Sequence, residues 1–153
     1  MKLLIDTTYL LPAIGVAIRH LPRTIVRDLR GRGHVISIST MTIFELAAKG
    51  ARFVRDGKLT QERVHEGLAA VLNDKALGQI HFQELEVLER AITMRAQISD
   101  FIDCIILCSA AVSSDALVSE DEELRDLVSQ GDIRAKLNPT NDAFAAYPSR
   151  EVP

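Results

Sequence analysis

The stretch Lys2-Leu3-Leu4-Ile5-Asp6-Thr7-Thr8 decides the fold that we expect for this chain. Its consecutive apolar residues are typical of a buried strand, and a carboxylate follows them directly. A later apolar run, Ala116-Leu117-Val118-Ser119, also ends beside an acid, Asp121. In an open α/β sheet the carboxyl ends of the strands form the edge where ligands bind, so we expect these two acids to share a site.

The rest of the chain alternates between strand-like and helix-like patterns. We predict further strands at 34–39, 78–85 and 133–137, and helices from Pro12 and at 22–31, 41–54, 61–72, 84–97, 101–112 and 121–127. Strands separated by helices predict right-handed crossovers and a parallel sheet with helices on both faces, which is an α/β fold.

Two of the predicted helices carry expectations about burial. In the helix at 84–97 we expect Leu85, Leu88, Ile92 and Met94 to face inward. The helix at 101–112 is unusually apolar, because Asp103 is its only charged residue, and we expect it to be the most enclosed helix.

The composition fits one compact domain. A chain of 153 residues with 47% hydrophobic residues can bury a core without disulfides. We predict a single domain at 1–137 and a C-terminal tail at 138–153, where prolines recur among polar residues. No run reaches the ~18 uncharged apolar residues of a membrane span, so we expect a cytoplasmic protein. Cys104 and Cys108 are too few to hold zinc and are interpreted as buried thiols.

The net charge of −3 conceals an uneven distribution. Residues 19–58 carry nine Lys or Arg against three acids, whereas residues 59–153 carry eight against seventeen acids. The basic half could attract a polyanion and the acidic half could hold cations. Four arginines at helical spacing predict one basic stripe, which could equally be a solvated helix face: Arg19, Arg23, Arg27 and Arg30.

Two more acids stand among small or apolar residues, Glu45 and Asp103. Burying an unpaired carboxylate costs several kcal/mol, which a bound cation would offset. With Asp6 and Asp121 they predict a divalent metal held by carboxylates. Each has a structural alternative. Asp6 is a favoured helix N-cap, Asp121 suits a helix N-terminus, Glu45 could face solvent, and Asp103 could join a capping box begun by Asp100.

The order and spacing of these acids resemble the PIN domain family, particularly its single-domain VapC-type ribonucleases. The resemblance covers residues 2 to about 137. It is carried by four stretches: Leu4-Ile5-Asp6-Thr7-Thr8, the run from Ile38 to Leu46 that contains Glu45, the run from Asp103 to Ala110, and Leu117-Val118-Ser119-Glu120-Asp121-Glu122-Glu123-Leu124. In this family the last acid usually follows Thr-x, and Ser119 keeps the hydroxyl at that position.

The resemblance implies a three-layer α/β/α sandwich with a central parallel sheet, and a metal-dependent endoribonuclease. Mg²⁺ or Mn²⁺ would be held by Asp6, Glu45, Asp103 and Asp121, with Asp100 as a further candidate ligand. Thr7 and Ser119 would be supporting hydroxyls. Phosphate contacts would come from Arg19, Arg23, Arg27, Arg30, Lys49 and Arg52.

The resemblance also implies partners. Besides the RNA substrate, a toxin of this type would have a small antitoxin that covers the site, and homodimerisation is the habit of the family. Two alternatives remain open. The chain could process or bind RNA outside a toxin–antitoxin system, or it could be a non-catalytic Mg²⁺-binding signalling domain of the receiver type.

Overall fold

The computed structural model describes residues 1–141 and 143–153. Its centre is a sheet of five parallel strands in the order β3-β2-β1-β4-β5. The strands are β1 (Lys2–Ile5), β2 (Val35–Ser39), β3 (Gly78–Ile80), β4 (Ala116–Val118) and β5 (Ala145–Tyr147). The fold is therefore α/β with a central parallel sheet, as the sequence predicted.

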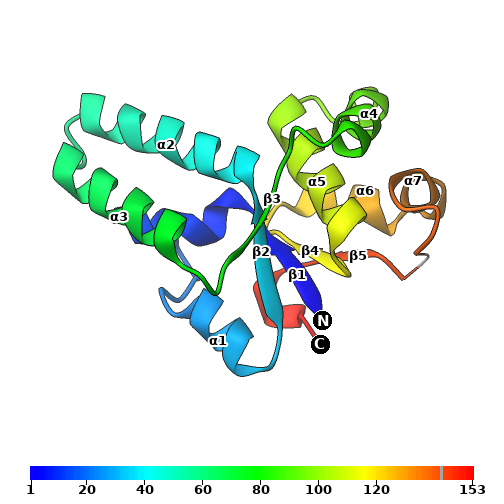
Figure 1. Cartoon of the computed structure of the whole chain (residues 1–153), viewed down its shortest axis with the longest axis horizontal. Helices are drawn as coiled ribbons and strands as arrows, with labels where there is room; N and C mark the ends of the chain where they lie inside the picture. The colour runs from blue at the N-terminus through cyan, green and yellow to red at the C-terminus, as the bar shows by residue number, and fades with distance from the viewer. Residues whose placement is uncertain (142) are drawn as a thin grey trace.

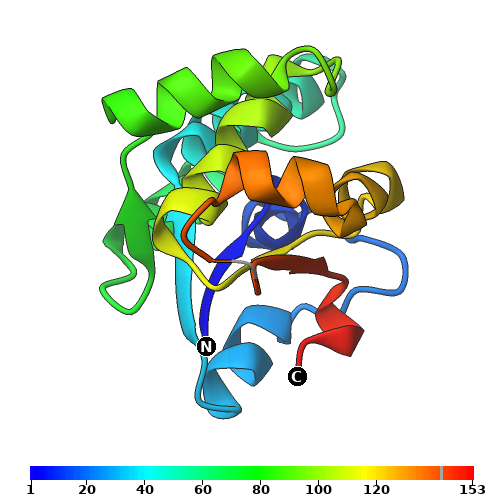
Figure 2. The ribbon, with the colours of Figure 1, turned by 90° about the vertical axis from the view of Figure 1, so that its right-hand side faces the viewer.

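Helices cover both faces of the sheet (Figure 1; Figure 2). In chain order they are η1 (Thr7–Ile14), α1 (Ile25–Gly31), α2 (Thr40–Arg55), α3 (Gln61–Asn73), α4 (Leu85–Met94), α5 (Phe101–Ser113), α6 (Glu122–Ser129), α7 (Gly131–Leu137) and η2 (Ser149–Glu151). The elements η1 and η2 are 3₁₀ helices. Helices α2 and α3 pack side by side and project from one end of the sheet (Figure 1).

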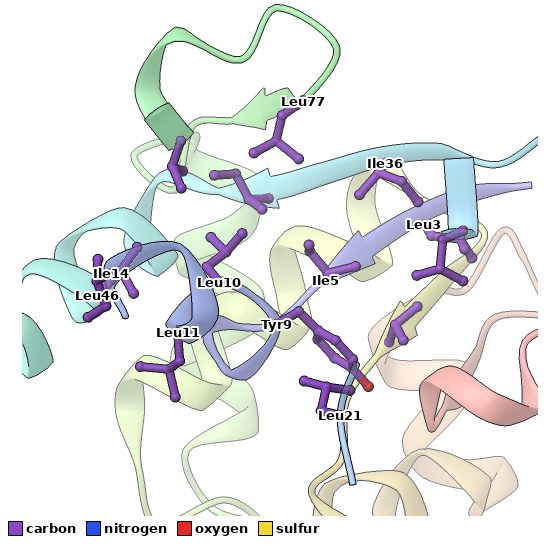
Figure 3. Close-up of a cluster of buried hydrophobic side chains, with 14 of the residues drawn as sticks. Leu3, Ile5, Tyr9, Leu10, Leu11, Ile14, Leu21, Ile36, Leu46 and Leu77 are labelled. Atoms are coloured by element: carbon purple, nitrogen blue, oxygen red, sulfur yellow. The ribbon is translucent and has the colours of Figure 1, made fainter. Parts of the chain in front are cut away.

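Alternation along β1 creates two separate cores. Leu3 and Ile5 belong to a cluster with η1, α2 and α3, part of which is shown in Figure 3. Leu4 points to the opposite face, where it packs with residues of α4, α5, α6 and α7. Because successive side chains of a strand point to opposite faces, this pattern produces the three layers of an α/β/α sandwich.

Helix α5 is the most enclosed helix, as predicted. Eight of its residues, Cys104–Ala111, are buried in succession. Both cysteines lie in this run as free, buried thiols, which confirms their structural interpretation. Burial raises the pKa of both thiols, that of Cys108 to about 12.

Several predictions about the elements were wrong. Residues 133–137 form part of helix α7 rather than a strand, because Ile133 and Leu137 are both buried at the four-residue spacing of one helix face. The fifth strand is β5, which pairs with β4 inside the segment predicted as a tail. On α4, Met94 is buried as predicted, but Leu85 and Ile92 are 70% and 66% exposed, and Val87 and Ala91 complete the buried face.

The predicted basic stripe was also wrong. Helix α1 begins only at Ile25, so Arg19 and Arg23 precede it and do not share a helix face with the later arginines. Arg23, Arg27 and Arg30 line a hollow with residues of η1 and α3, and Arg30 forms an ion pair of 2.8 Å with Asp74.

Within the described residues, no helix is long and apolar enough to cross a membrane.

Candidate active site at the carboxyl edge of the sheet

The predicted acids all line one pocket of about 350 Å³. They reach it from four segments of the chain. Asp6 follows β1, Glu45 lies in the second turn of α2, Asp100 and Asp103 lie at the start of α5, and Asp121 precedes α6. Thr7 and Ser119 line the same pocket. The carboxyl ends of β1, β2 and β4 meet at this edge, so strands that are distant in sequence deliver their acids to one place.

Three of the acids are fixed by helix capping. Asp6 accepts a hydrogen bond of 2.7 Å from the backbone N–H of Thr8, at the start of η1. Asp100 caps α5 through the N–H of Ile102, and Asp121 caps α6 through the N–H of Leu124. The capping alternatives considered for Asp6, Asp100 and Asp121 are therefore present, and the same carboxylates line the pocket.

Two hydroxyls hold one carboxylate oxygen each of Asp6 and Glu45. Ser119 Oγ donates to Asp6 Oδ2, and it accepts the backbone N–H of Asp121 at 3.1 Å. Thr7 Oγ1 donates to Glu45 Oε2. Ser119 and Thr7 thus orient the acids of neighbouring segments.

Lys49 lies one helical turn after Glu45 and forms an ion pair of 2.7 Å with its Oε1. It also lines the pocket. The sequence had suggested Lys49 only as a phosphate contact, although its i,i+4 spacing from Glu45 could have indicated the pair. Arg52 lies further along α2, where it is exposed and contacts the ring of Phe53.

Asp103 differs from the other acids, because it makes no side-chain hydrogen bond with the residues that the structure describes. Burial raises the pKa of its carboxyl to about 6, and the negative charges of Asp100, Glu45, Asp121 and Asp6 contribute to this rise. Burial also raises the pKa of Asp6, against the opposing hydrogen bonds from Ser119 and Thr8. The pocket therefore holds excess negative charge that a cation would relieve.

The donor set fits a hard divalent cation, since carboxylate and hydroxyl oxygens suit Mg²⁺ and Mn²⁺. Within the described residues, however, no group of three or more His, Cys, Asp or Glu side chains is arranged so that it could hold a metal ion. Mg²⁺ does not require such a cage, because it usually keeps several waters and binds one or two carboxylates together with substrate phosphates.

Comparison with known proteins identifies the family. The model of the PIN domain matches residues 3–129. A search of curated protein sequences found no match. Among solved structures, the fold matches a chain in the crystal structure of VapBC2 from Rickettsia felis bound to a DNA fragment from their promoter. The TM-score is 0.60 at 18% identity, over 97% of this chain and 98% of that one. PIN domains are generally nucleases and typically use a divalent metal. The chain belongs to the PIN domain family.

Proposed function

We propose that this protein is a Mg²⁺- or Mn²⁺-dependent endoribonuclease and the toxin of a toxin–antitoxin pair. The observation that carries the nuclease proposal is the convergence of five acids on one pocket, where burial and the negative charges of the other acids raise the pKa of Asp103 to about 6. Family membership supports the same reaction class. The likeness to a chain of a VapBC complex supports the toxin assignment.

The proposed ligands of the cation are drawn from Asp6, Glu45, Asp103 and Asp121, with Asp100 as an additional carboxylate. One or two of them would bind the cation directly, and the others would accept hydrogen bonds from its waters. When bound, a divalent cation polarises the phosphate and lowers the pKa of water. Glu45 can turn toward the cation if its ion pair with Lys49 opens, which would free the ammonium group to contact a substrate phosphate. Thr7 and Ser119 hold the carboxylates in place through the hydrogen bonds described above.

The proposed reaction is hydrolysis of an RNA phosphodiester. The oxygen of a water molecule forms a bond to phosphorus, the bond to the leaving ribose oxygen breaks, and a proton is transferred to that oxygen. A pocket carboxylate that accepts a hydrogen bond from the water would orient it for attack. Lys49 is the phosphate contact favoured here, because it lines the pocket itself.

Cleavage assays on purified protein test the nuclease proposal. Mixed RNAs incubated with Mg²⁺ or Mn²⁺ should be cut internally, and EDTA, Asp6→Asn or Asp103→Asn should abolish cutting while the far-UV circular dichroism stays unchanged. Glu66→Gln removes an exposed acid of α3 and should cut like the wild type. Full activity of Asp6→Asn, or cleavage that persists in EDTA, would contradict the mechanism.

Growth assays test the toxin assignment separately. Expression of the wild type should arrest a bacterial host, and Asp103→Asn should not. Co-expression of a short protein encoded beside this chain should restore growth if that protein is the antitoxin. Cleavage without growth arrest would favour the alternative, an RNA-processing enzyme outside a toxin–antitoxin system.

A homodimer is the proposed assembly. Leu85 and Ile92 on α4 present apolar side chains to solvent, and covering them would be favourable. Light scattering should give the mass of two chains. Leu85→Ser combined with Ile92→Ser should then produce monomers, whereas a monomeric wild type would rule out the dimer.

A further inference from the structure

Three hydrogen-bond donors converge on one oxygen beside the candidate active site. Glu120 lies between Ser119 and Asp121, and its Oε1 accepts Tyr9 Oη at 2.7 Å. The same oxygen accepts both the backbone N–H and the Oγ of Ser149, at 3.1 and 2.9 Å. One carboxylate therefore joins three segments: η1, the loop after β4, and η2.

Two of these segments are firmly anchored. Tyr9 is 3% exposed, and Figure 3 shows its ring packed beside Leu21 with the hydroxyl oxygen at the far end. Ser149 is 7% exposed, and Val152 just after it is buried in the same core as Tyr9. Arg32 also donates to the carbonyl of Val152 at 3.0 Å. The donors that hold Glu120 are thus fixed by the packing of the core.

The loop held by Glu120 carries two site residues. Ser119 Oγ contacts both Asp6 and the N–H of Asp121, so a shift of this loop would move two of the proposed ligands together. On the other side, the backbone N–H of Ser119 donates to the carbonyl of Tyr147 in β5 at 2.9 Å. Both Tyr147 and Ser149 lie beyond the residues matched by the family model, which end at 129.

We propose that Glu120 is a positioning residue, which uses Tyr9 and the C-terminal Ser149 to set Ser119 and Asp121 for cation binding. This inference rests on the proposed function and extends it. Glu120 touches neither substrate nor cation. Its effect passes through the loop, so the C-terminal segment becomes part of the active-site framework. Groups that orient metal ligands typically contribute 10–100-fold to metal affinity or activity.

The test compares variants at Glu120 and Ser149 with the wild type. Glu120→Ala should weaken Mn²⁺ binding, measured by isothermal titration calorimetry without RNA, by about 10-fold. It should raise the Mg²⁺ concentration for half-maximal cleavage by a similar factor and leave the KM for RNA at saturating Mg²⁺ unchanged. Glu120→Gln keeps an acceptor oxygen and should restore most of the affinity. Ser149→Ala should cause a smaller loss in the same direction.

Two controls make the result specific. Glu122→Ala removes an exposed acid from the first turn of α6 and should leave Mn²⁺ binding unchanged, which separates positioning from loss of negative charge. In the Glu120→Ala background, Ser149→Ala should cause no further loss of Mn²⁺ affinity, because both residues act through one hydrogen-bond network. Thermal melting verifies that each variant is folded, and Glu120→Gln and Ser149→Ala carry the test if Glu120→Ala unfolds.

The outcomes separate the two proposals. If the wild type neither binds Mn²⁺ nor cuts RNA, the proposed function fails. If the wild type does both and Glu120→Ala matches it, or if Glu122→Ala has the same effect as Glu120→Ala, the positioning role of Glu120 is refuted while the nuclease remains.

Discussion

Replacing Asp103 with Asn should stabilise the protein in the absence of metal. The ionised Asp103 carboxylate is partly buried among four other acids, and its pKa rises from the ordinary value of 3.8 to about 6. Asn has nearly the same shape and no charge, so it removes both the cost of burying the charge and the repulsion. The variant that abolishes the proposed activity is therefore expected to be the more stable protein in EDTA.

The size of this effect follows from the pKa. A rise from 3.8 to about 6 corresponds to about 3 kcal/mol if fully expressed. Because Asp103 is only half-buried, solvent screening reduces our expectation to about 1–2 kcal/mol. The folded-state pKa lies above the unfolded one, so the folded state loses stability as pH rises from about 4 to about 6. The difference in free energy of unfolding between Asp103→Asn and the wild type should be near zero below pH 4 and should reach its full size above pH 7.

Urea unfolding at several pH values, in EDTA and in Mg²⁺, measures this directly. At pH 8 in EDTA, the free energy of unfolding of Asp103→Asn should exceed that of the wild type by about 1–2 kcal/mol. Mg²⁺ at ten times its Kd should stabilise the wild type by about 1.4 kcal/mol and should leave the variant nearly unchanged. Glu66→Gln should show neither effect. A variant that is less stable than the wild type at pH 8 in EDTA, or a difference independent of pH, would refute the electrostatic reasoning.

Two further substitutions test the packing and the charges around the site. Gly67→Ala would place a Cβ 2.4 Å from the carbonyl oxygen of Ala13 in η1, so it should lower the free energy of unfolding by about 1–3 kcal/mol; Gly31→Ala, with open space around it, should be neutral or stabilising. Chemical unfolding of the pair at pH 7 checks this, and equal effects would contradict it. Asp74→Asn should lower stability by about 1 kcal/mol at pH 7, measured in urea. Burial tends to raise the pKa of Asp74, but hydrogen bonds from Arg30 and a backbone N–H, together with the Arg30 charge, hold it below its usual value. The loss of stability in Asp74→Asn should therefore shrink as pH falls through that pKa. A loss that persists unchanged at pH 2 would contradict the ion pair.

Local patterns singled out some of the acids, and the set of four together with the family resemblance supplied the rest. Asp6 and Asp121 follow apolar runs that are typical of buried strands, and Asp103 stands alone in an apolar helix. The parallel sheet then brings those strand ends together. Strand β5 was not predictable in the same way, because Ala145 and Ala146 carry little strand preference and the strand is defined by its pairing with β4.

Long-range contacts account for the other differences. Leu85 and Ile92 repeat with helical spacing on one face of α4, and the buried Val87, Ala91 and Met94 repeat on another. The packing of α5 against α4 decides which of the two faces is buried. Tyr9 and Ser149 both donate to Glu120, although they lie 111 and 29 positions from it in the sequence. No local sequence pattern marks these contacts. Periodicity predicts that a helix exists, whereas its neighbours decide which side is covered.

A carboxylate that caps a helix can also line the pocket, so helix capping and the proposed ligand role do not exclude one another. Asp6, Asp100 and Asp121 each accept a backbone N–H at a helix start, where the positive end of the helix dipole offsets part of their charge. Glu45 instead gains the ammonium group of Lys49. Asp103 has neither kind of partner among the described residues, and burial together with the charges of the other acids raises its pKa to about 6. The fold can therefore assemble the acids without metal, and a cation could bind Asp103 without replacing a hydrogen bond or ion pair of its side chain to the described residues.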